Sequence, residues 1–177
     1  MDEVQSLREQ LKGAMKSRAM LYVALYDEIS KEVGADKATA IMQRAIRSRG
    51  AALGARFRRH APADFAALRD DFLGFLGAEP GKPGMFDVEV RRCDASGLDI
   101  KFHVCPMKEA WVEAGLDPKL VQTMCAIAGQ VDNGAFESAG FELDACTWTV
   151  GGEDGCCLLQ IRRAEQSSDR RVDQPAG

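Results

Sequence analysis

The 177-residue sequence lacks any long hydrophobic run. No apolar stretch approaches the roughly 20 residues that a helix needs to cross a bilayer. The acidic start, Met1-Asp2-Glu3, is not followed by the hydrophobic segment of a secretory signal. These absences predict a cytoplasmic protein without a membrane partner. The hydrophobic fraction of 46% and the charged fraction of 28% are typical of a soluble globular protein.

Short motifs of several well-known protein classes are also missing. The sequence has no CxxC pair of a zinc finger, no GxSxG turn, no P-loop and no GxGxxG after a predicted strand. These absences exclude the zinc-finger, α/β-hydrolase and nucleotide-binding classes that such motifs define. What the sequence does contain is six cysteines, and five of them lie between Cys105 and Cys157.

Acidic residues are absent between Lys37 and Ala63, although the net charge of the whole chain is −4. This segment contains six arginines but only one aromatic residue, Phe57, so we do not expect a nucleic-acid partner. The arginines either form a solvated helix face near a helix C-terminus or anchor an anionic substrate. In the second case Arg56 and Arg59 are the candidate substrate-binding residues.

The N-terminal half predicts three helices, because its apolar residues recur at helical spacing. We expect these helices over residues 3–33, 36–58 and 62–76. Gly34 ends the first helix, Asp36 caps the second, and Pro62 suits the first turn of the third. The small residues Gly50 and Gly54 would let another helix approach the second helix closely.

The hydrophobic period changes from 3.6 to 2 after the Pro- and Gly-rich residues 79–84. Alternation over residues 86–91 and 98–104 predicts a β-hairpin, and two further strands are expected over residues 141–150 and 156–162. Two helices are expected between these strand pairs, over residues 106–114 and from 118 to about 131.

The predicted fold class is therefore α+β, with N-terminal helices packed on a four-stranded antiparallel sheet and two inserted helices. We expect one domain over residues 1–164. Within it, residues 1–78 form a helical layer, and residues 85–163 form the sheet and the inserted helices. The polar residues 165–177 are expected to be a disordered tail.

Cys105 is the cysteine best placed for chemistry. Strand alternation puts His103 and Cys105 on the same face, about 7 Å apart. Pro106 then places Cys105 at the N-cap of a helix, where the helix dipole lowers the pKa of a thiol and favours the nucleophilic thiolate. The alternative is a cysteine that only packs at the end of a strand. Cys93 and Cys146 are expected to be small buried hydrophobic residues.

Three other residues are candidates for the same site. Cys125 and Asp132 are seven residues apart, on nearly the same helix face, although Asp132 also suits an ordinary C-terminal turn. Cys156 and Cys157 point to opposite faces of a strand, so at most one of them serves a given site. Cys105, Cys125 and Cys156 match no standard metal spacing, but a fold that joined them would favour zinc or a similar soft metal.

Several of these landmarks resemble the L-2-amino-thiazoline-4-carboxylic acid hydrolase family. The resemblance rests on Ala24-Leu25-Tyr26 and Val104-Cys105-Pro106, continues through Cys125 and Asp132, and ends at Gly152 with Cys156. It covers roughly residues 20 to 163. It implies a hydrolase that acts on carbon–nitrogen bonds of a small cyclic amidine such as 2-amino-thiazoline-4-carboxylate and gives a carbamoyl-cysteine.

The resemblance also implies a site. Its catalytic candidates are Cys105, Cys125, Cys156, Asp132 and His103. The partner is a small-molecule carboxylate, which Arg56 and Arg59 would hold. In a variant mechanism, Cys105, Cys125 and Cys156 bind a metal, for example zinc, whose water attacks the substrate. Two other functions stay open: a non-catalytic small-molecule or metal-binding sensor of the 4-vinyl-reductase-like type, and an interaction domain that forms a homodimer through the first helix.

Overall fold

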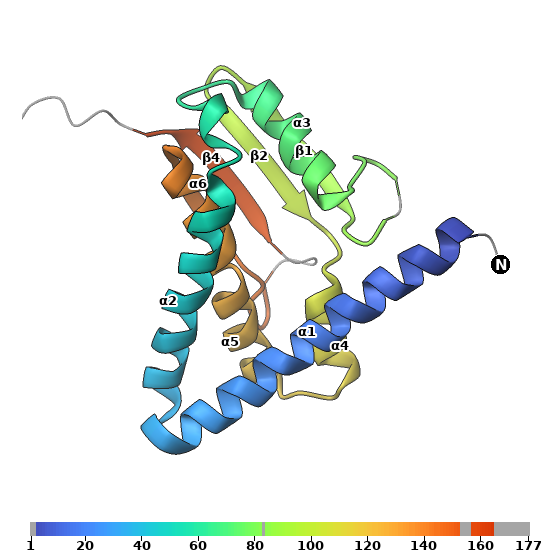
Figure 1. Cartoon of the computed structure of the whole chain (residues 1–177), viewed down its shortest axis with the longest axis vertical. Coiled ribbons are helices and arrows are strands. Elements are labelled where there is room, and N and C mark those ends of the chain that lie inside the picture. Colours follow the sequence, from blue (N-terminus) through green and yellow to red (C-terminus); the bar gives the residue numbers. More distant parts are fainter. Residues whose placement is uncertain (1–2, 83, 153–156, 165–177) are drawn as a thin grey trace, which may run out of the picture.

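The structure is a computed structural model that describes residues 3–82, 84–152 and 157–164 (Figure 1). Its elements in chain order are α1 (Glu3–Val33), α2 (Ala35–Gly54), the short 3₁₀-helix η1 (Arg58–His60), α3 (Phe65–Leu76), β1 (Val88–Asp94), β2 (Gly97–Phe102), α4 (Pro106–Glu113), α5 (Pro118–Ala128), α6 (Gln130–Ala139), β3 (Phe141–Cys146) and β4 (Leu158–Arg163). The predicted α+β class is confirmed. The tail over residues 165–177 lies outside the described residues.

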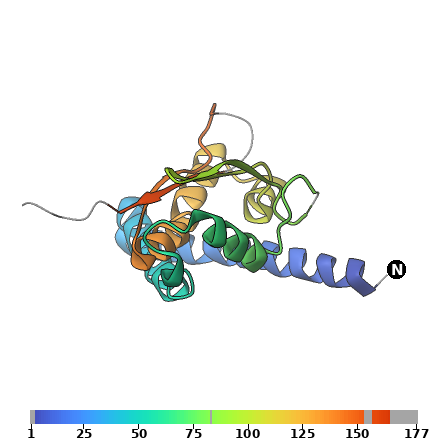
Figure 2. The ribbon, with the colours of Figure 1, turned by 90° about the horizontal axis from the view of Figure 1, so that it is seen from above.

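The four strands form one antiparallel sheet in the order β1-β2-β4-β3. The last strand, β4, therefore lies between β2 and β3, and Leu159 of β4 stands opposite Ile100 of β2. Helix α3 packs on β1 and β2, and α6 packs on β3. Figure 2 shows these two helices on the same side of the sheet.

The core on that side of the sheet is built around aromatic rings. The ring of Phe57, which precedes η1, stacks on that of Phe136 from α6 with 5.6 Å between centroids. Phe72 of α3 meets Phe136 edge to face at 5.1 Å. These rings pack with Ile100 and Ile161 of the two central strands. Burying one such side chain stabilises the fold by about 1.5–3 kcal/mol. This core therefore holds α3 and α6 to the sheet.

A second core joins α1, α4 and α5 away from the sheet. Trp111 of α4 is buried, and its indole N–H donates a hydrogen bond of 2.9 Å to the carbonyl oxygen of Ala19 in α1. Val23, Met124 and Ile127 complete the buried surface around it. This core holds one face of α1. Among the described residues, no helix is both long enough and apolar enough to cross a membrane.

Helices α2 and α6 touch backbone to backbone. A Cβ atom built on Gly134 of α6 would lie 2.0 Å from the carbonyl oxygen of Arg47 in α2. A Cβ atom on Gly50 would lie 2.1 Å from the carbonyl oxygen of Val131, and one on Gly54 would lie 2.2 Å from that of Ala135. Only glycine at these three positions permits the crossing, since a side chain needs more room.

Three sequence predictions about helix boundaries are wrong. Asp36 does not cap α2, because α1 and α2 are joined by Gly34 alone, which adopts φ 84° and leaves Asp36 inside the first turn. The second helix ends at Gly54 instead of Arg58. The third helix begins after Asp64, not at Pro62, since the Asp64 side chain accepts a hydrogen bond from the Ala67 N–H at 3.1 Å.

The number of inserted helices is also corrected, from two to three. The segment around Asp132-Asn133-Gly134, expected to be a turn, is part of α6. This segment is helical because the crossing with α2 buries Gly134 and Ala135 and requires a helical backbone there. Cys146, expected to be buried, is exposed at the end of edge strand β3, whereas Cys93 is half-buried as a packing residue.

The helix crossing generates a direct test. Replacing Gly134 with alanine should destabilise the protein by about 1–3 kcal/mol, because the new methyl group overlaps the α2 backbone and the helices must separate. Gly74→Ala is the matched control, since a Cβ there meets nothing within 4 Å. It should stabilise α3 by about 0.5–1 kcal/mol. Urea unfolding measures the change in the free energy of unfolding for both variants. Equal changes would show that the crossing is not tight.

Candidate functional site

Cys105 lies where the two cores meet. It is half-buried, and it packs against both the sheet core and the α1–α4–α5 core. Its backbone is extended, with φ −135° and ψ 117°, and Pro106 follows as the first residue of α4. The Glu109 N–H donates to the Cys105 carbonyl oxygen at 3.0 Å, which closes the first helical turn. Cys105 is thus the N-cap residue of α4, at the positive end of the helix dipole.

Three further groups interact electrostatically with Cys105. Burial raises the pKa of Cys125 to about 12, with Cys105 acting in the same direction and Lys108 opposing. Burial and Cys105 together raise the pKa of Asp132 to about 7. The pKa of Cys157 is raised well above its usual range by burial, and by Asp132, Cys105 and Cys125. We call Cys105, Cys125, Asp132 and Cys157 the cysteine centre.

These shifts assign protonation states around neutral pH. Cys125 and Cys157 remain neutral thiols, because apolar surroundings penalise the charged form. Asp132, in the first turn of α6, divides between its protonated and ionised forms near pH 7. A carboxyl group in that state can both donate and accept a proton, which suits general acid–base catalysis.

Residues 147–152, which follow β3, contribute to the surroundings of the cysteine centre. The Trp148 backbone makes a hydrogen bond with Cys157, which opposes the rise in its pKa. The Lys108 ammonium group lies 5.1 Å from the centroid of the Trp148 ring. The Val150 N–H donates to the Gln122 side-chain oxygen at 3.0 Å, so this segment is held against α5. A cation and an aromatic ring are thereby placed next to the thiols.

His103 is placed differently from the expectation that it shares a strand face with Cys105. Strand β2 ends at Phe102, so the alternation does not extend to either residue. His103 is exposed, and its Nε2 lies 3.0 Å from a carboxylate oxygen of Glu89 on β1. A role for His103 in proton transfer stays a prediction.

Arg56 and Arg59 both bind Asp71 of α3. Each guanidinium group lies 2.8 Å from a different oxygen of that carboxylate, and His60 Nε2 lies 3.1 Å from one of them. These three donors lower the pKa of Asp71 to about 2 against the opposing effect of burial. The contacts tie the end of α2 and η1 to α3, which gives the two arginines a structural role.

The predicted metal site of Cys105, Cys125 and Cys156 stays a prediction, because one of its three ligands is not among the described residues. Across residues 3–82, 84–152 and 157–164, no three histidine, cysteine or acidic side chains are grouped as metal ligands. Cys156, the third predicted ligand, lies outside the described residues. The five described cysteines are free thiols.

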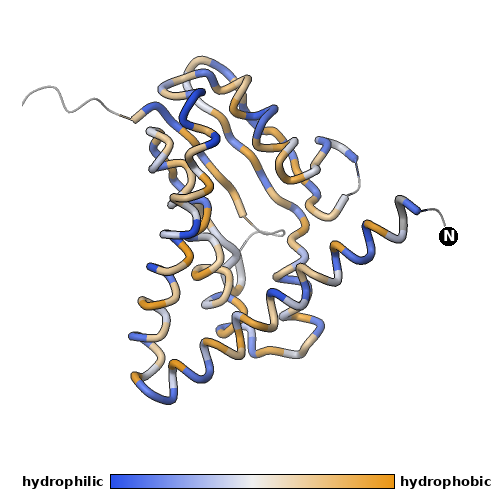
Figure 3. Tube along the Cα trace, in the orientation of Figure 1, coloured by the Kyte–Doolittle hydropathy of each residue, from blue (hydrophilic) through white to orange (hydrophobic). Residues whose placement is uncertain are grey.

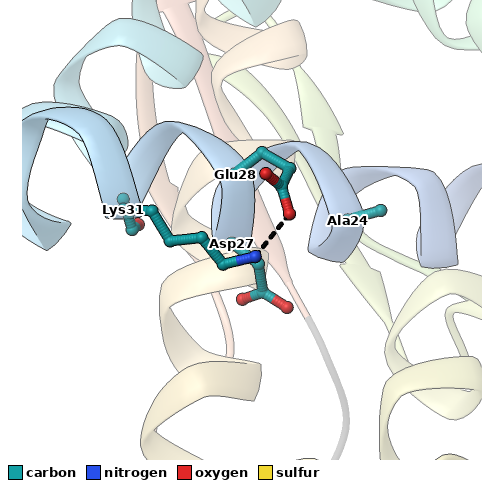
Figure 4. A pocket seen from close by; sticks show the side chains of 5 residues that line it. Ala24, Asp27, Glu28 and Lys31 are labelled. Carbon is teal, nitrogen blue, oxygen red and sulfur yellow. Dashed lines mark hydrogen bonds and ion pairs between the residues drawn. The ribbon is translucent and has the colours of Figure 1, made fainter.

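Two surface depressions lie elsewhere. One, on α1, is lined by Ala24, Asp27, Glu28, Ser30 and Lys31, and Figure 4 shows Lys31 paired with Glu28 at 2.5 Å. The other lies between α2 and α6, where Arg47 pairs with Glu137. The residues that line these two depressions include no member of the cysteine centre.

Sequence reasoning missed three residues beside the predicted ones. Cys157 belongs to the centre, but the facing argument could not choose between it and Cys156. Lys108 follows Cys105 by three residues on the predicted helix, and this spacing was the available signal. Trp148 was assigned to a strand, whereas β3 ends at Cys146.

Together these features define an α+β protein with thiol and carboxyl groups gathered at the start of a helix. The chain belongs to the L-2-amino-thiazoline-4-carboxylic acid hydrolase family, whose model matches residues 14–160. This match confirms the resemblance seen in the sequence.

Comparison with curated proteins finds no match. Among solved structures, the chain is similar to a trafficking protein particle complex subunit 3 from Naegleria fowleri, in a crystal structure of that protein covalently bound to palmitic acid. The two share 18% identity with a TM-score of 0.47, over 87% of this chain and 97% of that one.

The raised pKa of Asp132 predicts a specific pH dependence of stability. A carboxyl group whose pKa rises from 3.8 to about 7 on folding favours the folded state fully below pH 4, and this contribution is lost as pH increases to 7 and beyond. Asp132→Asn removes the titration. When the pH rises from 5 to 8, the free energy of unfolding of the native chain should fall by about 2–3 kcal/mol more than that of the variant. Urea titrations at both pH values measure this difference, and parallel losses would contradict the raised pKa.

Proposed function

We propose that this protein is a hydrolase that opens a small cyclic amidine such as 2-amino-thiazoline-4-carboxylate, with Cys105 as the nucleophile. Family membership supports the reaction class. The observation that carries the proposal is the arrangement of the cysteine centre: Cys105 caps α4, and Asp132, with a pKa of about 7, interacts with it. A nucleophile and a proton-transfer group therefore stand together.

Cys105 is the best nucleophile among the described cysteines. The pKa values of Cys125 and Cys157 are raised, so both thiols stay protonated and weakly nucleophilic. Cys93 and Cys146 lie on the two edge strands, β1 and β3. Cys105 is at a helix N-terminus, where the dipole favours a thiolate.

In the first step, the Cys105 thiolate attacks the amidine carbon, C2, of the ring. The bond from C2 to the ring sulfur breaks, and protonated Asp132 gives its proton to that sulfur. The opened substrate stays attached to Cys105 through C2 as an isothiourea. No atom is lost and no oxidation occurs in this step.

In the second step, water attacks C2. The Asp132 carboxylate transfers one proton of this water to the former ring nitrogen, so the carbon–nitrogen double bond becomes a single bond. It takes the other proton as a carbonyl group forms and the Cys105 thiolate departs. One water is consumed, carbamoyl-cysteine is released, and both residues return to their starting states.

The substrate carboxylate needs a cation. The charge of Lys108 acts on Cys125 of the cysteine centre, whereas Arg56 and Arg59 bind Asp71. We assign carboxylate binding to Lys108. Lys108→Met should raise KM about tenfold or more with a smaller change in kcat, because it removes a charge-assisted contact. Arg59→Gln is the control and should leave KM unchanged. The reverse pattern in steady-state kinetics would assign the carboxylate to the arginines.

The central test is turnover by cysteine variants. Cys105→Ser should reduce hydrolysis of 2-amino-thiazoline-4-carboxylate by at least about 10³-fold, because a hydroxyl group ionises far less readily than a thiol. Cys146→Ser, which changes an exposed cysteine at the end of β3, should keep full activity. Product formation is followed by mass spectrometry, and circular dichroism verifies the fold of each variant.

Other outcomes are equally informative. Full activity of Cys105→Ser would remove this residue from the nucleophile role. Saturable binding of the substrate without turnover by the native chain would favour the sensor function instead. Loss of activity on chelation, restored by zinc, would favour the metal-dependent mechanism.

A further inference from the structure

The N-terminal half of α1 extends away from the rest of the molecule, as Figures 1 and 2 both show. Helix α1 has 31 residues and is therefore about 46 Å long. Every residue from Leu7 to Ala14 is exposed. Helices of about 12–15 residues are only marginally stable in water without a packing partner. This half of α1 is held to its own chain by charged contacts such as Lys12 with Glu109, whereas Leu7 and Leu11 remain exposed.

Four exposed leucines form a stripe along α1. Leu7, Leu11, Leu21 and Leu25 are 58%, 53%, 55% and 47% exposed. At 100° per residue, all four lie within about 80° of one another around the helix axis. Hydrophobic segments accordingly recur along α1 into its projecting half (Figure 3). Large exposed apolar stripes of this kind mark interaction surfaces.

The stripe is separate from the face that holds α1 to its own chain. That face uses Ala19 and Val23, which are buried against α4 and α5, and Lys12 and Lys16, which pair with Glu109 and Glu113 of α4. A partner can therefore contact the leucines without displacing an intramolecular contact.

We propose that the leucine stripe of α1 binds the same stripe of a second copy of this chain, in antiparallel orientation. A two-fold axis beside residue 16 places Leu7 opposite the partner's Leu25 and Leu11 opposite the partner's Leu21. The four leucines therefore match in self-complementary pairs, as a two-fold interface requires. The projecting half of each copy lies along the C-terminal half of the other.

Charge decides between antiparallel and parallel pairing. Residues 3–18 of α1 contain four basic and two acidic residues, whereas residues 19–33 contain three acidic residues and one basic residue. Antiparallel pairing brings the basic half of each copy beside the acidic half of the other. Parallel pairing would put Arg18 beside the partner's Arg18 and Glu28 beside the partner's Glu28, which is repulsive.

The proposal is tested on the full chain by analytical ultracentrifugation across a concentration series. We expect a dimer, and we expect Leu11→Glu and Leu25→Glu each to raise its dissociation constant at least about tenfold, because each buries a charge in place of a leucine. Val112→Glu is the control: Val112 is 54% exposed but lies on α4, so its substitution should leave the dimer intact. Near-ultraviolet circular dichroism verifies that each variant keeps its tertiary fold.

Cysteine cross-linking tests the orientation. Oxidation of the double variant Leu7→Cys, Leu25→Cys should give an intermolecular disulfide between positions 7 and 25, identified by peptide mass spectrometry, because these positions face each other only in the antiparallel arrangement. A monomer at all concentrations, or a dimer that Leu11→Glu and Leu25→Glu leave unchanged, would overturn the proposed interface. Disulfides that join position 7 to position 7 and position 25 to position 25 would instead overturn the orientation. Hydrolase activity enters none of these measurements.

Discussion

The architecture depends on the direct contact between the backbones of α2 and α6. Glycine inside a helix costs roughly 0.5–1 kcal/mol relative to alanine, and the crossing uses Gly50, Gly54 and Gly134. That cost is offset because close approach lets Phe136 of α6 reach Phe57 and the sheet core. The crossing also fixes the first turn of α6, and therefore places Asp132 beside Cys105.

The proposed chemistry follows from the meeting of two hydrophobic cores at one residue. Cys105 packs against both, so apolar surroundings exclude water from the thiols next to it and raise their pKa values. The same burial holds the pKa of Asp132 near 7, which an exposed aspartate would not reach. The helix start at Pro106 adds a fixed dipole that acts on Cys105 alone among these cysteines. Similar thiols thereby acquire different roles from their positions.

Local signals in the sequence predicted most of the fold. The end of α1 at Gly34, the hairpin after residues 79–84 and the N-cap Cys105 follow from short-range chemistry. Helix α6 was missed because Asn133-Gly134 is typical of a turn, and only the distant contact with α2 makes it helical. For the site, alternation and helical spacing selected Cys105, Cys125 and Asp132, but β2 ends at Phe102, and Cys125 and Asp132 lie on separate helices, α5 and α6. The ion pairs of Arg56 and Arg59 with Asp71 depend on tertiary contacts that no spacing reveals.

The most direct test of the account is to trap the covalent intermediate. Native protein is mixed with 2-amino-thiazoline-4-carboxylate, quenched in acid within milliseconds, digested and analysed by peptide mass spectrometry. The proposed reaction predicts that the peptide containing Cys105 gains the full mass of the substrate, because ring opening loses no atom before water attacks. Product formation with the adduct on Cys125 or Cys157, and with Cys105 unmodified, would contradict it.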